Sequence, residues 1–140
     1  MSQARIVLVT GGMGGLGETI STKMVDAGYK VAVTYSPGNK SHAEWVAAMK
    51  ANGYEILAVP CDVADYDSCA HAVAAVQSQL GAIDVLVNNA GITRDMTFKK
   101  MDKVNWDAVM RTNLARVRRL ALERLLGAAR CGGRIQARRL

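Results

Sequence analysis

Five glycines lie within eight residues near the start of the chain, and this is the first segment that could do chemistry. Residues 10–17 read TGGMGGLG and follow the apolar run RIVLV. A glycine turn between a buried strand and a helix lets phosphate oxygens reach free backbone N–H groups at the positive end of the helix. Gly11 would make the tight turn, Gly15 the close backbone approach, and Gly17 the close packing of helix on strand. A flexible turn without a ligand is the alternative.

Short apolar runs alternate with segments of helical period, which predicts βαβ units around a parallel sheet. We expect strands over residues 5–10, 29–35, 54–60 and 83–89. Right-handed crossovers give the strand order 3-2-1-4 of an α/β, Rossmann-type, doubly wound sheet. The loops TGGMGGLG and NNAGITRD would then meet where the strand order reverses, which is where such sheets bind ligands.

The helices that must position these loops are predicted over residues 15–27, 42–52 and 66–80. Ser41 and Glu44 are in capping-box register for the second helix, and Asp65 precedes the third. A further helix should begin near Asp102 and carry one apolar face formed by Trp106, Val109, Met110 and Leu114.

The composition excludes several classes of protein. The 140 residues are 50% hydrophobic and 21% charged, as in one globular domain. No apolar run approaches the roughly 18 residues of a membrane helix, and the N-terminus lacks the apolar core of a secretory signal, so we expect a cytoplasmic protein without a membrane partner. Cys61, Cys69 and Cys131 are odd in number and widely spaced, which favours buried thiols over a disulfide framework or a metal site.

The net charge of +6 is concentrated at one end of the chain. Residues 115–140 hold eight arginines and one glutamate, and residues 1–114 carry a net charge of −1. We therefore divide the chain into a dinucleotide-binding portion over 1–114 and an aberrant Arg-rich tail over 115–140 that is not a separate domain. A tail of Arg, Ala, Leu and Gly is typical of out-of-frame reading of a GC-rich gene, so we expect a frameshift or truncation near residue 115. A nucleic-acid-binding arm is the alternative, although no nucleic-acid partner is expected.

Four motifs together resemble the short-chain dehydrogenase/reductase family over residues 4–114. They are TGxxxGxG at 10–17, Asp62-Val63 after the third strand, NNAG at 88–91, and Asn113. The resemblance implies a sheet truncated before its remaining strands and, for the full-length family, a homotetramer. Taken alone, Asp62 could equally be a turn-forming aspartate. The cofactor contacts that the resemblance and the local sequence imply are Gly11, Met13, Gly14, Gly15, Leu16, Gly17, Ser36, Lys40, Ser41, Cys61, Asp62, Val63, Asn89, Ala90, Gly91, Ile92 and Thr93.

The end of the second strand indicates which cofactor is used. An NAD-dependent enzyme places a carboxylate there against the ribose 2′-hydroxyl. This chain has no acidic residue between Thr34 and Ser41, whereas Lys40 with Ser36, Asn39 and Ser41 could receive a 2′-phosphate. We therefore expect NADP(H), with an ordinary solvated Lys40 as the alternative.

Three longer stretches, VTGGMGGLG, NNAGITRDMTFKKM and WDAVMRTNL, are similar to the NADPH-dependent acetoacetyl-CoA reductases within the family. The resemblance implies reduction of acetoacetyl-CoA to (3R)-3-hydroxybutyryl-CoA in polyhydroxybutyrate synthesis, with Asp95 on the substrate side. Arg94, Lys99 and Lys100 could meet the coenzyme A phosphates or form a plain solvated face. A 3-oxoacyl-ACP reductase and a non-catalytic nucleotide-binding chain are the alternatives; the former more often has Ser-Arg where this chain has Met13-Gly14.

The family reduces ketones with a Tyr, a Lys four residues later, a Ser, and an Asn on the preceding helix that helps to hold a water. Asn113 matches the Asn. None of the four tyrosines in the chain is followed four residues later by lysine. We therefore expect the 140-residue chain to be inactive by itself.

Overall fold

A parallel sheet of four strands forms the centre of the computed structural model, which describes residues 3–92 and 96–115. The strands are β1 (Ile6–Val9), β2 (Lys30–Tyr35), β3 (Ile56–Pro60) and β4 (Val85–Val87), each slightly shorter than predicted. They lie in the order β3-β2-β1-β4, and every neighbouring pair is parallel. The predicted fold class and strand order are therefore confirmed.

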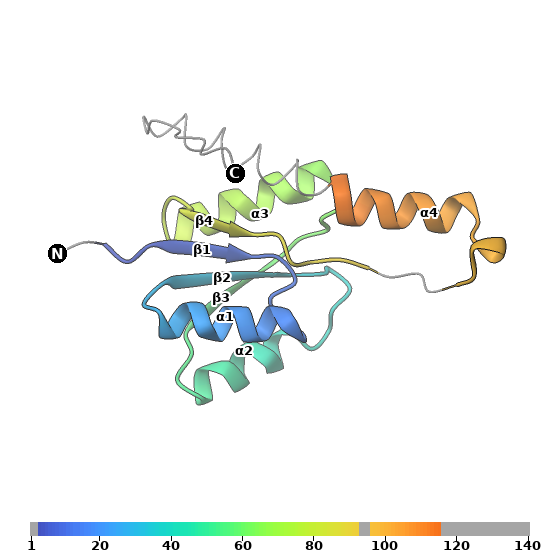
Figure 1. The fold of residues 1–140 in the computed structure, drawn as a ribbon. Helices are drawn as coiled ribbons and strands as arrows, with labels where there is room; N and C mark the ends of the chain where they lie inside the picture. The colour runs from blue at the N-terminus through green and yellow to red at the C-terminus, as the bar shows by residue number, and fades with distance from the viewer. Residues whose placement is uncertain (1–2, 93–95, 116–140) are drawn as a thin grey trace.

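Helices lie on both sides of this sheet (Figure 1). The helices α1 (Leu16–Asp26) and α2 (His42–Ala51) lie on one side, and α3 (Tyr66–Gln79) lies on the other. Beyond β4, the 3-10 turn η1 (Phe98–Lys100) precedes α4 (Lys103–Met110), which runs directly into the π-helical turn η2 (Arg111–Ala115). The predictions for Thr93, Asp95 and nearly all of the Arg-rich tail fall outside the described residues.

Alternate residues of β1 enter two separate hydrophobic clusters, because successive strand side chains point to opposite faces. Ile6 and Leu8 pack with residues of α3, whereas Val7 and Val9 pack with residues of α1 and α2. All four side chains are buried. A strand covered on both faces needs apolar residues at every position, which is why its sequence shows no alternation.

The four helix starts differ in how their first N–H groups are satisfied. The carboxylate of Asp65 accepts from the Ser68 N–H at 2.9 Å at the start of α3, and that of Asp102 accepts from the Asn105 N–H at 2.8 Å at the start of α4. Ser41 at the start of α2 makes no side-chain cap; its hydroxyl donates to Asn39 Oδ1 at 3.0 Å instead. The predicted capping box of Ser41 and Glu44 is therefore wrong, because Ser41 has backbone angles of φ −97° and ψ 8° instead of the extended angles that let an N-cap side chain reach the helix N–H groups.

The apolar face predicted for α4 is largely exposed in the described part of the chain. Trp106 is 52% exposed, Met110 39% and Leu114 60%. No helix among residues 3–92 and 96–115 is long and apolar enough to cross a membrane, and the same residues contain no cluster of three His, Cys, Asp or Glu side chains suited to a metal ion.

The difference between the helix caps can be measured. Replacing Asp65 by Ala removes the acceptor for the Ser68 N–H, so the free energy of unfolding should fall by about 1 kcal/mol. Ser41→Ala is the matched control and should change it much less, because the Ser41 hydroxyl caps no helix N–H. Urea denaturation followed by circular dichroism measures both values. Equal losses would contradict the assignment of the two caps.

Candidate cofactor site

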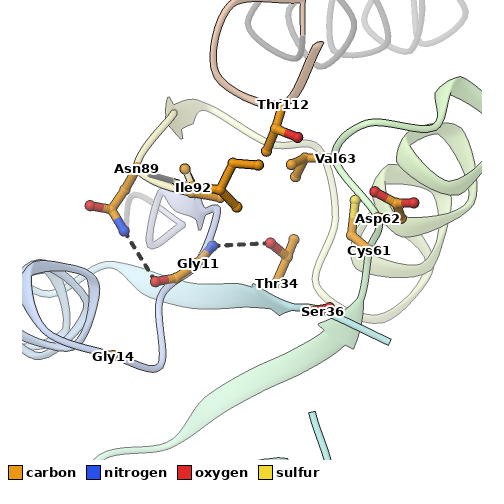
Figure 2. Close-up of a pocket in the computed structure, with 12 residues that line it drawn as sticks. Gly11, Gly14, Thr34, Ser36, Cys61, Asp62, Val63, Asn89, Ile92 and Thr112 are labelled. Atoms are coloured by element: carbon orange, nitrogen blue, oxygen red, sulfur yellow. Dashed lines mark hydrogen bonds between the residues drawn. The ribbon is translucent and has the colours of Figure 1, made fainter. Parts of the chain in front are cut away.

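A cavity of about 510 Å³ opens at the carboxyl ends of the strands, between the loops that follow β1 and β4 (Figure 2). This is the place where a doubly wound sheet binds its ligand. Four segments far apart in the sequence close around it, together with one residue of η2. The lining residues are Gly11, Gly14, Thr34, Ser36, Cys61, Asp62, Val63, Asn89, Ala90, Gly91, Ile92 and Thr112.

The glycine turn is held against its neighbours by hydrogen bonds and by a very close backbone contact. Gly11 has a φ of +63°, and its N–H donates to Thr34 Oγ1 at 3.2 Å. Asn89 Nδ2 donates to the carbonyl oxygen of Gly11 at 3.1 Å, and Figure 2 shows both bonds. A Cβ on Gly17 would lie 2.1 Å from that same oxygen. Positions 11 and 17 thus need glycine for different reasons, the first for its backbone angle and the second for space.

Gly12 has a packing role that the sequence did not reveal. A Cβ there would lie 2.3 Å from Cγ1 of Val33 and 2.9 Å from Oγ of Ser21. The glycine therefore lets the turn lie directly against β2 and α1. Its two neighbours belong to other elements, so no local pattern in the sequence points to this contact.

The N-terminus of α1 has no side-chain cap. Gly15 occupies the N-cap position with a φ of +52°, and within the described part of the chain no side chain accepts from the first N–H groups of the helix. The Gly17 N–H donates to the Gly14 carbonyl at 3.0 Å. The helices α3 and α4 have aspartate caps, whereas α1 and α2 do not. An uncapped helix start beside a cavity can satisfy its N–H groups with an anion, and the helix dipole adds to the attraction.

Thr10 positions the NNAG loop. Its buried hydroxyl oxygen accepts from the N–H groups of Asn89 and Ala90, each at 3.0 Å, and the hydroxyl donates to the Val87 carbonyl at 3.4 Å. The hydroxyl thereby continues the pairing of β1 and β4 beyond the last ladder residues. It directs the chain after β4 across the end of β1 and into the cavity wall.

Asn113 holds the far end of the same loop. Its Oδ1 accepts from the Ile92 N–H at 2.9 Å, and its Nδ2 donates to the Ile92 carbonyl at 2.8 Å. It lies on η2, and a π-helical turn often marks a functional position in a helix. Its side chain therefore positions the loop. The role that the family resemblance predicts for Asn113, helping to hold a water for proton transfer, stays a prediction.

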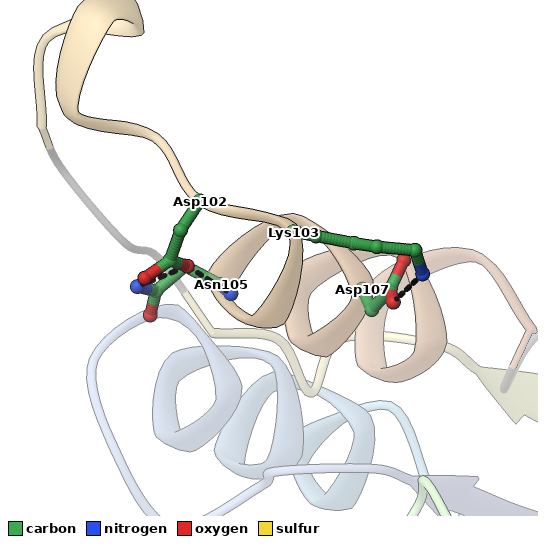
Figure 3. Close-up of polar contacts among 4 residues, drawn as sticks. All are labelled: Asp102, Lys103, Asn105 and Asp107. Carbon is green, nitrogen blue, oxygen red and sulfur yellow. Dashed lines mark hydrogen bonds and ion pairs between the residues drawn. The ribbon is translucent and has the colours of Figure 1, made fainter.

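Helix α4 carries this turn toward the cavity from a well-defined start (Figure 3). Asp102 Oδ1 accepts from both the N–H and the Nδ2 of Asn105, each at 2.8 Å. Lys103 and Asp107 form an ion pair one turn along the exposed side. Such a surface pair contributes little stability, so the cap is the stronger determinant of where the helix begins.

Asp62 combines the two roles that its sequence context left open. Its Oδ1 accepts from the Ala64 N–H at 2.9 Å, which forms the turn after β3. Its N–H donates to Ser68 Oγ at 2.8 Å, so α3 holds the residue in place. The residue is exposed and lines the cavity, and its Oδ2 makes no hydrogen bond within the described part of the chain. One carboxylate oxygen therefore remains for a ligand.

The corner after β2 contains aromatic and polar groups. The rings of Tyr35 and His42 stack with centroids 4.2 Å apart, which ties the end of β2 to the first residue of α2. Asn39 Oδ1 accepts from the Ser41 N–H at 2.9 Å. Lys40 is exposed beside them. This corner therefore has an ordered loop with one solvated ammonium group.

The structure brings together most, not all, of the residues predicted from the sequence. Ten of the predicted cofactor contacts line the cavity. Thr93, another predicted cofactor contact, and Asp95, the predicted substrate contact, lie outside the described residues. Thr34 and Thr112 line the cavity and were not predicted. Threonine is common in strands, so Thr34 does not stand out in the sequence, and no pattern singles out Thr112. Six predicted cofactor contacts do not line it, namely Met13, Gly15, Leu16, Gly17, Lys40 and Ser41.

A glycine turn, an uncapped helix and a cavity where the strand order reverses define a dinucleotide-binding α/β protein. The family model described as short chain dehydrogenase matches residues 5–135. The chain belongs to the short-chain dehydrogenase/reductase family.

Relatives and solved structures agree with this family. An acetoacetyl-CoA reductase of Cupriavidus necator is 44% identical over 110 residues, which are 79% of this chain and 45% of that protein. A 3-oxoacyl-(acyl-carrier-protein) reductase of Staphylococcus aureus is 44% identical over 115 residues, 81% of this chain and 46% of that protein. A short chain dehydrogenase of Burkholderia cenocepacia, solved in complex with NADP, superimposes with a TM-score of 0.79 at 31% identity, over 89% of this chain and 51% of that one. The chain thus spans about half the length of the relatives that it matches.

The link between Asn113 and Ile92 predicts a local dynamic effect. Asn113→Ala removes both hydrogen bonds to Ile92, so amide hydrogen exchange at Ile92 should accelerate about tenfold. Asn105→Ala, on the same helix and away from this loop, is the control and should leave the Ile92 amide unchanged. Residue-resolved exchange by NMR measures both rates. An unchanged Ile92 rate in the first variant would show that the loop is held by other contacts.

Proposed function

We propose that this chain binds NADP(H) in the cavity, as the cofactor-binding part of an NADPH-dependent acetoacetyl-CoA reductase. The observation that carries the proposal is the convergence of Gly11, Asp62 and Asn89 on one cavity at the reversal of strand order. Three separate motifs of the family meet there, although more than 20 residues separate each from the next. The similarity to an acetoacetyl-CoA reductase supplies the substrate class.

The residues present fit a dinucleotide. Apart from the neighbouring residues in the chain, a Cβ at Gly14 or Gly15 would have no protein atom within 4 Å, so the side of the turn that these two glycines form is open. The uncapped N–H groups of α1 begin at this turn and suit a pyrophosphate. The free oxygen of Asp62 suits the adenine amino group, and the NNAG loop, held by Thr10 and Asn113, suits the ribose and the nicotinamide side.

Selectivity for NADP(H) over NAD(H) is assigned to the corner after β2. Ser36 lines the cavity, and Lys40 lies beside the uncapped start of α2. A 2′-phosphate placed there would meet an ammonium group and a helix N-terminus, both of which favour an anion. No carboxylate lies between Thr34 and Ser41 to accept a ribose 2′-hydroxyl in its place.

Bound NADPH would supply hydride to the ketone carbon of the acyl thioester. The chain's own part is to orient the cofactor through the Gly11 turn, Asp62 and the Asn89 loop, and to fix that loop through Asn113. Delivery of a proton to the ketone oxygen needs an acid beside it, and the chain has no Tyr-x-x-x-Lys motif to supply one. We propose that the chain binds cofactor without completing the reduction.

A second substrate class has a specific observation in its favour. The Staphylococcus aureus relative, named as a 3-oxoacyl-(acyl-carrier-protein) reductase, is as similar to this chain as the acetoacetyl-CoA reductase is. Both names describe reduction of a 3-oxoacyl thioester, and they differ in the carrier. Assembly into a homotetramer and a cytoplasmic location remain family-based proposals for the whole protein.

The role of Lys40 can be tested by charge reversal. Lys40→Glu should weaken NADPH binding about tenfold, because it replaces an attraction to the 2′-phosphate by a repulsion, and should leave NADH binding nearly unchanged. Lys50→Glu, at the other end of α2, is the matched control and should alter neither. Quenching of intrinsic fluorescence during nucleotide titration gives the dissociation constants. Equal losses for NADPH and NADH would contradict a contact with the 2′-phosphate.

Binding without turnover is a separate prediction. The 140-residue chain should bind NADPH in the same titration and show no acetoacetyl-CoA-dependent loss of absorbance at the nicotinamide band. A full-length acetoacetyl-CoA reductase, assayed in parallel, verifies the substrate and the buffer. Sustained NADPH oxidation by the 140-residue chain would show that some other group protonates the ketone.

A further inference from the structure

Two cysteine sulfurs face each other beside the candidate cofactor cavity. Cys61 follows β3 directly, Cys69 lies in the first turn of α3, and their Sγ atoms are 3.9 Å apart. Cys61 is 4% exposed and Cys69 is fully buried. The site described above assigns a chemical role to neither thiol.

The main chain holds the two residues in this arrangement. The Asp62 N–H donates to Ser68 Oγ at 2.8 Å, and the Cys69 N–H donates to the Asp65 carbonyl at 3.1 Å. The Cys69 Sγ also donates to the Asp62 and Val63 carbonyls, each at 3.8 Å, so the turn after β3 is held against α3 at Cys69. A disulfide needs the sulfurs to approach to about 2.05 Å, so closure from 3.9 Å requires a local shift of about 2 Å.

Only one of the two thiols faces the cavity. Cys61 lines it beside Asp62 and Val63 (Figure 2). Cys69 does not line it, although both cysteines belong to the hydrophobic cluster that packs α3 on the sheet. A small oxidant in the empty cavity would meet Cys61 first and find Cys69 in position to resolve the product. A ligand that fills the cavity would cover Cys61.

The hydrogen bond that Cys61 donates to Cys69, together with burial, raises the pKa of the Cys61 thiol well above its ordinary value. Because the thiolate is the reactive form, oxidation should be slow near neutral pH and faster as the pH rises. We therefore expect the raised pKa to slow the reaction, and the short distance between the two sulfurs to favour a disulfide as its product.

We propose that Cys61 and Cys69 form a dithiol that hydrogen peroxide converts reversibly to a disulfide through the cofactor cavity, and that a bound nucleotide protects it. The Cys61 sulfur attacks the peroxide O–O bond, giving a sulfenic acid and one water. The Cys69 sulfur then displaces the hydroxyl as a second water and forms the S–S bond. Two thiols are oxidised and one peroxide is reduced, and an added dithiol reductant reverses the change. The protection rests on the proposed function, whereas formation of the disulfide does not.

Closure of the disulfide should also weaken nucleotide binding. Drawing Cys61 toward α3 moves the adjoining Asp62, whose carboxylate is assigned to the adenine. We expect the dissociation constant for NADP⁺ to rise about fivefold in the oxidised chain and to recover after reduction.

The test treats the chain with hydrogen peroxide at about pH 8.5, where more of the thiol is ionised, with and without NADP⁺. Denaturation, alkylation and mass spectrometry then follow the loss of two hydrogen atoms and identify the linked peptides. NADP⁺ binding is measured independently by fluorescence titration. With NADP⁺ at about ten times its dissociation constant, the disulfide should form about tenfold more slowly, because only the unoccupied chain reacts.

Cysteine variants test whether the disulfide joins Cys61 to Cys69 and not another pair of residues. Cys131→Ser should still form the Cys61–Cys69 disulfide at the same rate, whereas Cys61→Ala and Cys69→Ala should each lose it. Circular dichroism verifies that the two single variants are folded, and peptide mapping of the unsubstituted chain answers the question by itself if either is not.

The outcomes distinguish the claims. Linkage of Cys131 instead, or sulfinic acid at Cys61 without a disulfide, would overturn the dithiol. If the titration shows that NADP⁺ is bound and the rate of disulfide formation is still unchanged, protection through the cavity is overturned. A disulfide in a chain that binds no NADP⁺ would refute the proposed function and the protection together, and would support the dithiol.

Discussion

The contact between the start of α1 and the end of β1 depends on the absence of a side chain at Gly17. A Cβ at that position would lie 2.1 Å from the Gly11 carbonyl oxygen, well inside any permitted contact. The Asn89 amide donates to the same oxygen, so strand, helix and the loop after β4 meet at one peptide group. Because the helix begins this close to the strand end, Gly14 in the turn just before it lines the cavity.

Buried hydroxyl and amide groups extend this junction to the neighbouring strands. The Thr10 hydroxyl accepts hydrogen bonds from the N–H groups of Asn89 and Ala90, and the Thr34 hydroxyl accepts one from the Gly11 N–H. Both threonines are buried, and a buried hydroxyl without a partner is costly. These bonds therefore stabilise the loops and also restrict them to one arrangement, which is what a preformed ligand site requires.

The helices with a side-chain cap and those without one lie at different places in the fold. Aspartates close the starts of α3 and α4, whereas α1 and α2 begin beside the candidate phosphate positions without a side-chain cap. Helix N–H groups without a side-chain cap cost some stability, and an anion could satisfy them. Cys61 lines the candidate cofactor cavity and its sulfur lies 3.9 Å from that of Cys69, which is why the proposed dithiol would respond to a bound nucleotide.

The parallel sheet, its strand order, the starts of α3 after Asp65 and of α4 near Asp102, and the family were all predictable from the sequence, because they follow from local periodicity, chain-order rules and short motifs. The sequence did not determine that Ser41 would turn away from its helix, that Thr34 and Thr112 would line the cavity, or that Gly12 would lie against Val33. It also gave no sign that Cys61 and Cys69, expected as separate buried thiols, would face each other. Each of these depends on which elements pack side by side and which hydrogen-bond partner lies nearest. Only the tertiary structure decides such contacts, because they join side chains that no sequence period relates.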